Sequence, residues 1–356
     1  MFLPMLCFCN PRKNEVIAPA GRIDEYQEDA YCRLAPSAGP GVSCGWDAFV
    51  TADFIYWTAR YDGLSYTASA FRSEYLDLNP KRGGVFHSNF GFDPGFKAGL
   101  GFLFDHDGWD LNLQYTWLFT REYFDQKTHP EFETSTFRPT WFDLSATPNL
   151  LPDEPPLTSA KSRYRFHFQS FDWELGRSFF LSPFLSIRPS VGMKGSWQEL
   201  DFTIRYRQVE SVDTIGQWRI LFDQNFWGFG PRLGFQSSWY LSKHWSLSAN
   251  FAAASLWSQF RVKRNDKQAN IADPDTPSIR LMKTKNQFHI VKPVIEMLVG
   301  IRYETWFKSL RYHYSFEAGF EQQYWFQQNQ LFSTFEESDH GDLQLMGLTL
   351  KLRFDF

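Results

Sequence analysis

Strict alternation of apolar and polar side chains is the feature of this 356-residue chain that most restricts its fold. Between residues 109 and 120 the partner positions are mostly polar, and every second residue is large and apolar: Trp109, Leu111, Leu113, Tyr115, Trp117 and Phe119. Successive side chains of a β-strand point to opposite faces, so this segment predicts a strand with one apolar face and one polar face. Segment 96–104 repeats the pattern, and residues 105–108 have a tight-turn composition, which predicts a hairpin.

The same unit recurs from residue 46 to the end of the chain. Ten segments alternate, near 46–58, 96–104, 109–120, 163–176, 184–198, 225–241, 245–259, 286–304, 308–326 and 342–356. Short turns and longer polar loops alternate between them, which is typical of barrels with short periplasmic turns and long external loops. We therefore predict an all-β fold, an antiparallel up-and-down transmembrane β-barrel of about ten strands over 46–356.

Three details of this barrel are less sharply defined. Segments 61–69 with 85–92, or 202–208 with 215–223, could form a further hairpin, so twelve strands stay open. The apolar set changes face within 163–175, which predicts a β-bulge near Ser170. A loop over about 122–162 and a basic loop containing 261–267 are assigned to the outside.

Composition favours a membrane barrel over a helical membrane protein. Aromatic residues make up 19% of the chain, yet the mean hydropathy is -0.40, and the sequence has no run of about 20 apolar residues that could span a bilayer as a helix. In a soluble barrel or sandwich, the alternative, the apolar face would be a core. The aromatic set is too large for that and clusters at strand ends, so we assign to two interfacial girdles Trp109, Trp117, Trp227, Trp239, Trp245, Trp257, Tyr312 and Tyr324.

The opposite face carries the charges. An Arg turned to lipid at mid-membrane costs roughly 2–4 kcal/mol, so the charged set is expected to line the lumen. The predicted pore-lining residues are Lys97, Asp110, Arg188, Lys194, Arg232, Lys292, Glu296, Arg302, Arg311, Glu317, Glu321, Lys351, Arg353 and Asp355. Cations outnumber acids in this set, which suggests a slight anion preference. In so small a barrel opposite charges could also pair across the interior and fill it.

The two ends of the chain differ in character. The last segment alternates up to Phe356, and a C-terminal strand ending in Phe resembles the signal read by the outer-membrane barrel assembly machinery. Residues 1–45 lack a sustained period and form an N-terminal lead-in, either a signal-peptide remnant or a flexible segment. All four cysteines, Cys7, Cys9, Cys32 and Cys44, lie there, with spacings that favour disulfides over a zinc site.

Segments 48–57 (AFVTADFIYW), 95–102 (GFKAGLGF) and 106–118, together with Asp62 and Gly63, resemble pore-forming major outer-membrane proteins of Legionella and the environmental chlamydiae. The resemblance spans about 45–356. It implies a porin-like barrel in the outer membrane of a Gram-negative cell, with cross-linking through cysteines as in chlamydial relatives. This chain has few cysteines and none in the predicted loops, which puts cross-linking in doubt.

Catalytic and metal-binding patterns are weak. Gly228, Gly230 and Gly234 lie inside a predicted strand with no helix behind them, so they indicate close packing, not a phosphate loop. The 105–108 segment lacks the acids that a calcium loop requires downstream. His313, Ser315 and Glu317 share the inward face, which raises an outer-membrane hydrolase, although one strand supplies neither a separate orienting group nor an oxyanion site.

The function that these patterns predict is an outer-membrane pore for passive diffusion of small hydrophilic solutes or ions. The alternative is a non-conducting barrel that acts as a structural protein or adhesin through long surface loops. We expect no enzyme activity, no cofactor, no metal and no nucleic-acid partner, because the sequence has no basic patch of that kind. The expected partners are outer-membrane lipid, the assembly machinery and the solutes, and self-association stays open.

Overall fold

The computed structural model describes residues 38–40, 42, 47–71, 84–104, 108–127, 135–141, 157–209, 215–270, 277–307, 311–332 and 341–356. The four cysteines and nearly all of the lead-in lie outside the described residues, so the disulfide and signal-peptide predictions are untouched by the structure. The same holds for most of the 105–108 turn.

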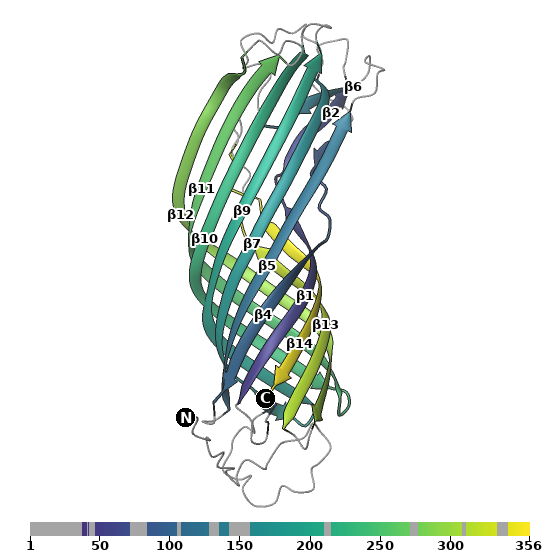
Figure 1. The fold of residues 1–356 in the computed structure, drawn as a ribbon, viewed down its shortest axis with the longest axis vertical. Helices are drawn as coiled ribbons and strands as arrows, with labels where there is room; N and C mark the ends of the chain where they lie inside the picture. Colours follow the sequence, from purple (N-terminus) through teal and green to yellow (C-terminus); the bar gives the residue numbers. More distant parts are fainter. Residues whose placement is uncertain are drawn as a thin grey trace, which may run out of the picture.

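Ten antiparallel strands among these residues close into a barrel (Figure 1). They are β1 (Ala48–Tyr61), β4 (Asp93–Leu103), β5 (Trp109–Lys127), β7 (Leu157–Arg177), β9 (Leu185–Val209), β10 (Ile215–Tyr240), β11 (Trp245–Asn270), β12 (Ile279–Phe307), β13 (Tyr312–Trp325) and β14 (Leu343–Asp355). Each pairs with its neighbour in the chain, β14 pairs with β1, and β7 pairs with β9. The predicted up-and-down barrel of about ten strands is confirmed.

Four short strands lie outside this ring. β2 (Ser65–Phe71), β3 (Val85–His87) and β6 (Ser135–Pro139) form a small sheet that joins β7 where Phe137 pairs with Leu157, and β8 (Phe179–Ser182) pairs with the start of β9. Residues 202–208 and 215–223 continue β9 and β10 as one pair. Neither candidate hairpin therefore adds strands to the barrel, and the twelve-strand alternative is wrong.

The strands are much longer than the predicted ones. β9, β10, β11 and β12 contain 25, 26, 26 and 29 residues, whereas a tilted strand needs about 9–11 to cross a bilayer. The basic stretch 261–267, predicted as a loop, is part of β11, and the predicted 122–162 loop is shortened at both ends by β5 and β7. These corrections share one cause: the barrel wall continues well above the membrane.

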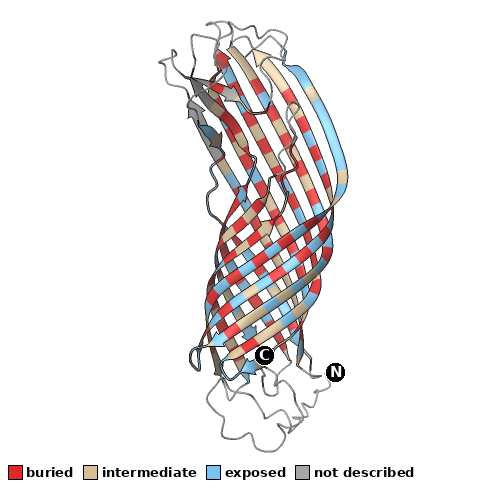
Figure 2. Cartoon of the chain, turned by 180° about the vertical axis from the view of Figure 1, so that it is seen from behind, coloured by how far each residue is buried: buried red, intermediate tan, exposed pale blue. Residues whose placement is uncertain are grey.

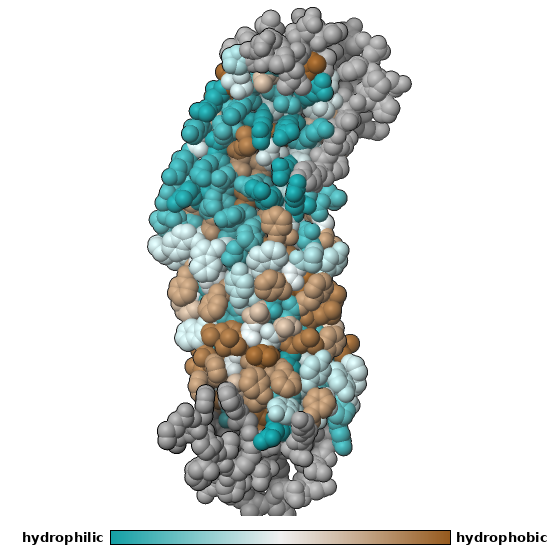
Figure 3. All heavy atoms as spheres, viewed as in Figure 1, coloured by the Kyte–Doolittle hydropathy of each residue, from teal (hydrophilic) through white to brown (hydrophobic). Residues whose placement is uncertain are grey.

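Outward side chains define a lipid-facing band in the lower part of the barrel. Figure 3 shows this brown band below a pale ring, with a hydrophilic surface above it. Trp227 and Trp239 of β10 are twelve residues apart, and so are Trp245 and Trp257 of β11. At about 3.4 Å per residue and a tilt of about 40°, twelve residues rise roughly 30 Å, the thickness of a bilayer's hydrocarbon core.

All eight predicted girdle residues lie on the outward face. Five Trp side chains are exposed, namely Trp109, Trp227, Trp239, Trp245 and Trp257. Trp117 stacks on Phe96, Tyr312 stacks on Phe354 and Tyr324 contacts Phe326. On β14, Leu348 and Leu352 are exposed while Lys351 and Arg353 line an interior cavity, so the soluble-barrel alternative is wrong. No helix among the described residues is long and apolar enough to cross a membrane.

Above the outer girdle the polarity of the two faces reverses. In β7, Phe171 and Trp173 point outward in the membrane, whereas Phe166 and Phe168 are fully buried in the barrel interior above it. The register runs without interruption through Ser170, which pairs with Thr116 and with Ser196. The predicted bulge near Ser170 is therefore wrong, because the surroundings change along the strand and the backbone does not. Figure 2 shows buried and exposed residues alternating along the strands.

Candidate functional site

The interior of the membrane-embedded half is the charged face that the sequence predicts. Thirteen of the fourteen predicted residues point inward: Lys97, Asp110, Arg188, Lys194, Arg232, Lys292, Glu296, Arg302, Glu317, Glu321, Lys351, Arg353 and Asp355. Arg311 is the exception, because it lies in the turn before β13 and is exposed beyond the end of the barrel. Its assignment to the lumen is wrong, although its position in the alternation matches His313 and Ser315.

One ion-pair network crosses the lumen between β7, β9, β10 and β12. The fully buried Lys194 Nζ lies 2.8 Å from Asp172 Oδ1 and 2.6 Å from Glu296 Oε1. Arg232 pairs with Glu296 at 2.6 Å and with Glu174. Every charge in this network has an opposite partner, as burial in a narrow lumen requires.

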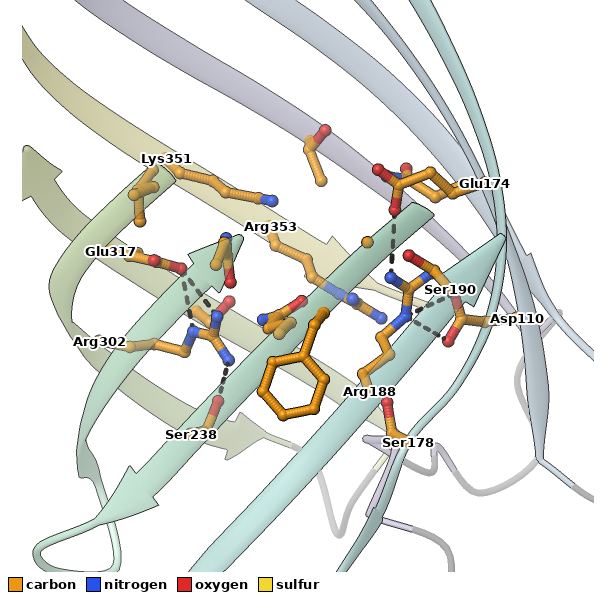
Figure 4. A pocket seen from close by; sticks show the side chains of 18 of the residues that line it. Asp110, Glu174, Ser178, Arg188, Ser190, Ser238, Arg302, Glu317, Lys351 and Arg353 are labelled. Atoms are coloured by element: carbon orange, nitrogen blue, oxygen red, sulfur yellow. Dashed lines mark hydrogen bonds and ion pairs between the residues drawn. The ribbon is translucent and has the colours of Figure 1, made fainter. Parts of the chain in front are cut away.

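The network continues toward the periplasmic end. Arg188 of β9 bridges Glu174, at 3.2 Å, and Asp110 of β5, as drawn in Figure 4. On the other wall Arg302 Nη2 lies 2.8 Å from Glu317, and Arg302 Nη1 donates to Ser238 Oγ at 3.2 Å (Figure 4). These contacts tie strands together across the interior.

Two further contacts engage acidic residues of β13 and β14 in the lumen. Lys97 Nζ lies 2.5 Å from Glu321 Oε1, although the residues are 224 positions apart. Asp355 accepts hydrogen bonds from Arg353 at 2.6 Å and is 2.7 Å from His313 Nδ1. Glu317, Glu321 and Asp355 on the inward face of β13 and β14 are thus each paired with a basic side chain, whereas Lys351 makes no ion pair with the described residues.

The sequence reasoning missed four inward acids of the lumen. They are Asp53, Asp172, Glu174 and Glu304. The alternation that identified Phe171 and Trp173 as outward would also have identified Asp172 and Glu174 as inward. With these acids counted and Arg311 removed, cations no longer outnumber acids, so the basis for an anion preference is lost.

The lumen contains a cavity of about 190 Å³. Ten of the predicted residues line it, whereas Lys194, Lys292 and Asp355 are buried in the wall around it. A cavity of this volume holds a few water molecules and is smaller than the roughly 300–1,000 Å³ of ordinary ligand pockets. Among the described residues, no group of three or more His, Cys, Asp or Glu side chains could hold a metal ion.

Aromatic side chains fill the barrel directly above the ion-pair network. Trp325 is fully buried, with its ring centroid 5.6 Å from that of Phe168 and 6.1 Å from that of Phe226. Phe226 in turn lies 4.9 Å from Phe260. Higher up, buried rings from several strands continue the layer as one core, including Tyr61, Tyr164, Phe166, Phe202 and Phe222.

A segment that follows β13 folds into the barrel and completes this closure. Gln328 is fully buried and hydrogen-bonds through Nε2 to Gln198 Oε1 at 2.9 Å, while Gln224 Nε2 donates to the Gln328 carbonyl at 2.9 Å. Gln224 Oε1 also accepts from the backbone amide of Gln330. Lys292, predicted to line a pore, donates instead to the carbonyls of this segment.

The hydrolase arrangement raised by the sequence is incomplete. His313 lies between Asp355 and Glu304, with Glu304 Oε2 3.8 Å from His313 Nε2, and its ring contacts that of Trp306. Within the described residues, Ser315 makes no hydrogen bond to His313.

The prediction that the strand glycines allow close packing agrees with the surroundings of Gly230, where an added Cβ would lie 2.0 Å from the Ser255 carbonyl oxygen.

Several solved structures show distant similarity to the chain. The chain resembles outer membrane protease OmpT of Escherichia coli (TM-score 0.36, 11% identity, 87% of this chain and 96% of that chain). It also resembles a Pseudomonas aeruginosa FadL homologue (0.25, 8%, 87% and 89%) and the Pseudomonas putida toluene transporter TodX (0.23, 7%, 87% and 89%). These similarities are too weak to carry an argument about activity, and no curated protein sequence matches significantly.

A family profile decides the relationship that the weak structural similarities leave open. Residues 39–356 match the family described as Legionella pneumophila major outer membrane protein precursor. This match covers the whole barrel and agrees with the lipid-facing band, which places the chain in a Gram-negative outer membrane. The chain belongs to the Legionella major outer membrane protein family.

Proposed function

We propose that this chain is a closed outer-membrane barrel with a structural or adhesive role, which holds a rigid folded wall above the membrane for contacts at the cell surface. The observation that carries the proposal is the aromatic layer around Trp325, Phe168 and Phe226, which fills the barrel interior above the ion-pair network. The strands continue for about twelve residues past the membrane, as β10 does from Trp227 to Ile215. The barrel wall therefore rises roughly 30 Å above the girdle.

Three observations favour closure over free diffusion. Most of the lumenal charges are paired, the aromatic layer lies above them, and the segment with Gln328 and Gln330 occupies the space between strands. A ten-stranded barrel is also near the size that side chains alone can fill.

A pore for small hydrophilic solutes is the second candidate. The charged cavity of about 190 Å³ in the membrane-embedded half favours it, since this cavity would form one half of a conducting path. Such a path would require the Gln328 segment and the aromatic layer to move aside.

Single-channel recording of the folded chain in planar bilayers separates the two candidates. We expect no stepwise conductance from the wild-type chain. Steps in the wild type whose size changes in Arg302→Gln, a cavity-lining variant, would overturn the closed barrel and establish the pore. Arg311→Gln, at the exposed turn, is the matched control for the same loss of charge. For the adhesive role, cells that display the chain should lose surface attachment when residues 142–156 are replaced by a short linker.

A further inference from the structure

The outward face of five neighbouring strands carries a dense group of positive charges directly above the outer girdle. Figure 3 shows this hydrophilic surface over the upper parts of β9, β10, β11 and β12. We call it the basic wall and define it by the outward residues Lys161, Arg163, Arg165, Asp201, Arg205, Arg219, Asp223, Lys263, Lys267, Arg280, Lys283 and Lys285.

Strand register places these residues in three adjacent rows. One row runs from Arg165 through Asp201, Asp223 and Lys263 to Lys285. The second row lies two residues farther from the membrane on each strand. Its charged members are Arg163 and Lys283, which lie at its two ends. The third row is entirely basic: Lys161, Arg205, Arg219, Lys267 and Arg280.

The basic wall has far more positive than negative charge. Ten of its residues are Lys or Arg and two are Asp. Rows spaced by about 6.8 Å along five strands spaced by about 4.8 Å cover roughly 500 Å². So many like charges on so small an area repel one another unless anions are bound between them.

The two acids of the basic wall are already engaged. Arg165 Nε donates to Asp201 at 2.8 Å, and Lys263 Nζ lies 2.9 Å from Asp223. Arg205, Arg219, Lys283 and Lys285 have no carboxylate within ion-pair distance among the described residues. The pKa of Arg219 is lowered by burial and by the neighbouring charges of Arg205 and Arg163, as expected for crowded cations.

The shape of the surface suits a bulky anionic group. A hollow of about 610 Å³ lies between the rows. Its lining contains two acids, Asp201 and Asp223, and seven cations: Arg163, Arg165, Arg219, Lys263, Arg264, Lys283 and Lys285. Thr203, Asn265 and Thr284 add uncharged hydrogen-bonding groups to its lining. Arg and Lys around a hollow form charge-assisted hydrogen bonds to phosphate oxygens.

The location of the basic wall identifies the partner. Below it, the girdle Trp227 and Trp257 mark the outer surface of the hydrocarbon core, so the wall faces the headgroup layer sideways and not the tip of the molecule. Clustered Lys and Arg at this position bind anionic lipid headgroups. Three rows extend over roughly 20 Å along the strands, beyond the reach of a simple phospholipid headgroup. We propose that the basic wall binds the phosphate-bearing inner saccharides of lipopolysaccharide in the outer leaflet.

The test is binding of the full-length folded chain, in zwitterionic detergent, to purified phosphorylated lipopolysaccharide. The double variant Arg219→Gln/Lys285→Gln removes two cations of the basic wall. Since each Lys or Arg at an anionic membrane surface contributes about fivefold in affinity, the dissociation constant should rise about 30-fold. The matched control Lys243→Gln/Arg311→Gln removes two exposed cations at the periplasmic turns and should leave binding unchanged.

Salt dependence and the removal of lipid phosphates test whether binding is electrostatic. Wild-type binding should weaken as salt is added, and it should be lost with lipopolysaccharide stripped of its phosphates. Equal affinity of both double variants, or undiminished binding to the stripped lipid, overturns the proposal. Tight binding of a sulfated polysaccharide without binding of lipopolysaccharide also overturns it, in favour of a soluble polyanion. Lys285→Gln alone, at an exposed position, gives the same comparison at about fivefold if the double variant does not fold.

Discussion

An Arg substitution on the outward face of β10 should have opposite consequences above and below the outer girdle. Leu233 lies six residues from Trp227 and six from Trp239, and its side chain is 64% exposed. Six residues correspond to about 15 Å of height, so Leu233 lies at the middle of the bilayer. Leu221 is on the same strand and the same face, but above the girdle, between Thr203 and Asn265.

The free energies of the two variants follow from that difference in height. Leu233→Arg places a charge at mid-membrane and should lower the free energy of unfolding by about 2–4 kcal/mol. This is roughly a 30- to 900-fold change in the folding equilibrium. Leu221→Arg places the same charge above the hydrocarbon core, among the solvent-screened cations of the basic wall, and should lower the free energy of unfolding by about 0–1 kcal/mol.

Reversible folding into lipid vesicles, titrated with denaturant and followed by tryptophan fluorescence, measures both values. The comparison uses one substitution type on one strand, so propensity and size effects largely cancel. Equal destabilisation by the two variants, or a larger effect at Leu221, would refute the position of the girdle and with it the reversal of polarity along the strands.

Two other predictions use the same unfolding measurement. Lys194→Met should lower the free energy of unfolding by about 3–5 kcal/mol, because it leaves Asp172 and Glu296 buried with one cation fewer. Adding Asp172→Leu should recover part of this loss. No recovery in the double variant would argue against the pairing of Lys194 with Asp172. In the upper barrel, burial raises the pKa of Asp266 above its ordinary value of 3.8, partly offset by Arg264. A raised pKa in the folded state stabilises the fold below the unfolded-state pKa, and this contribution is lost as the pH rises through the folded-state pKa. The wild type should therefore gain stability relative to Asp266→Asn as the pH falls from neutral toward 4, and an opposite slope would contradict the burial of this acid.

The sequence alone determined that the strands are two-faced, that about ten of them form the barrel, and which aromatic residues lie on the outward face. These features are local, because alternation with a period of two assigns each side chain to a face without reference to any other strand. Trp109, Trp239 and Trp257 are outward for this reason, and the final strand from Leu343 to Asp355 could be read from its own residues.

Only the tertiary structure decided which face is wet at each height. An alternating segment has the same pattern whether its apolar side faces lipid or a core, so Phe166 and Phe171 could not be assigned to a core and to lipid from sequence. The ion pair between Lys97 and Glu321 joins residues 224 positions apart, and the inward course of the segment with Gln328 depends on partners in two other strands. The closed lumen and the basic wall both arise from such non-local register, because closing the ring sets which charges meet inside it and which face the membrane surface.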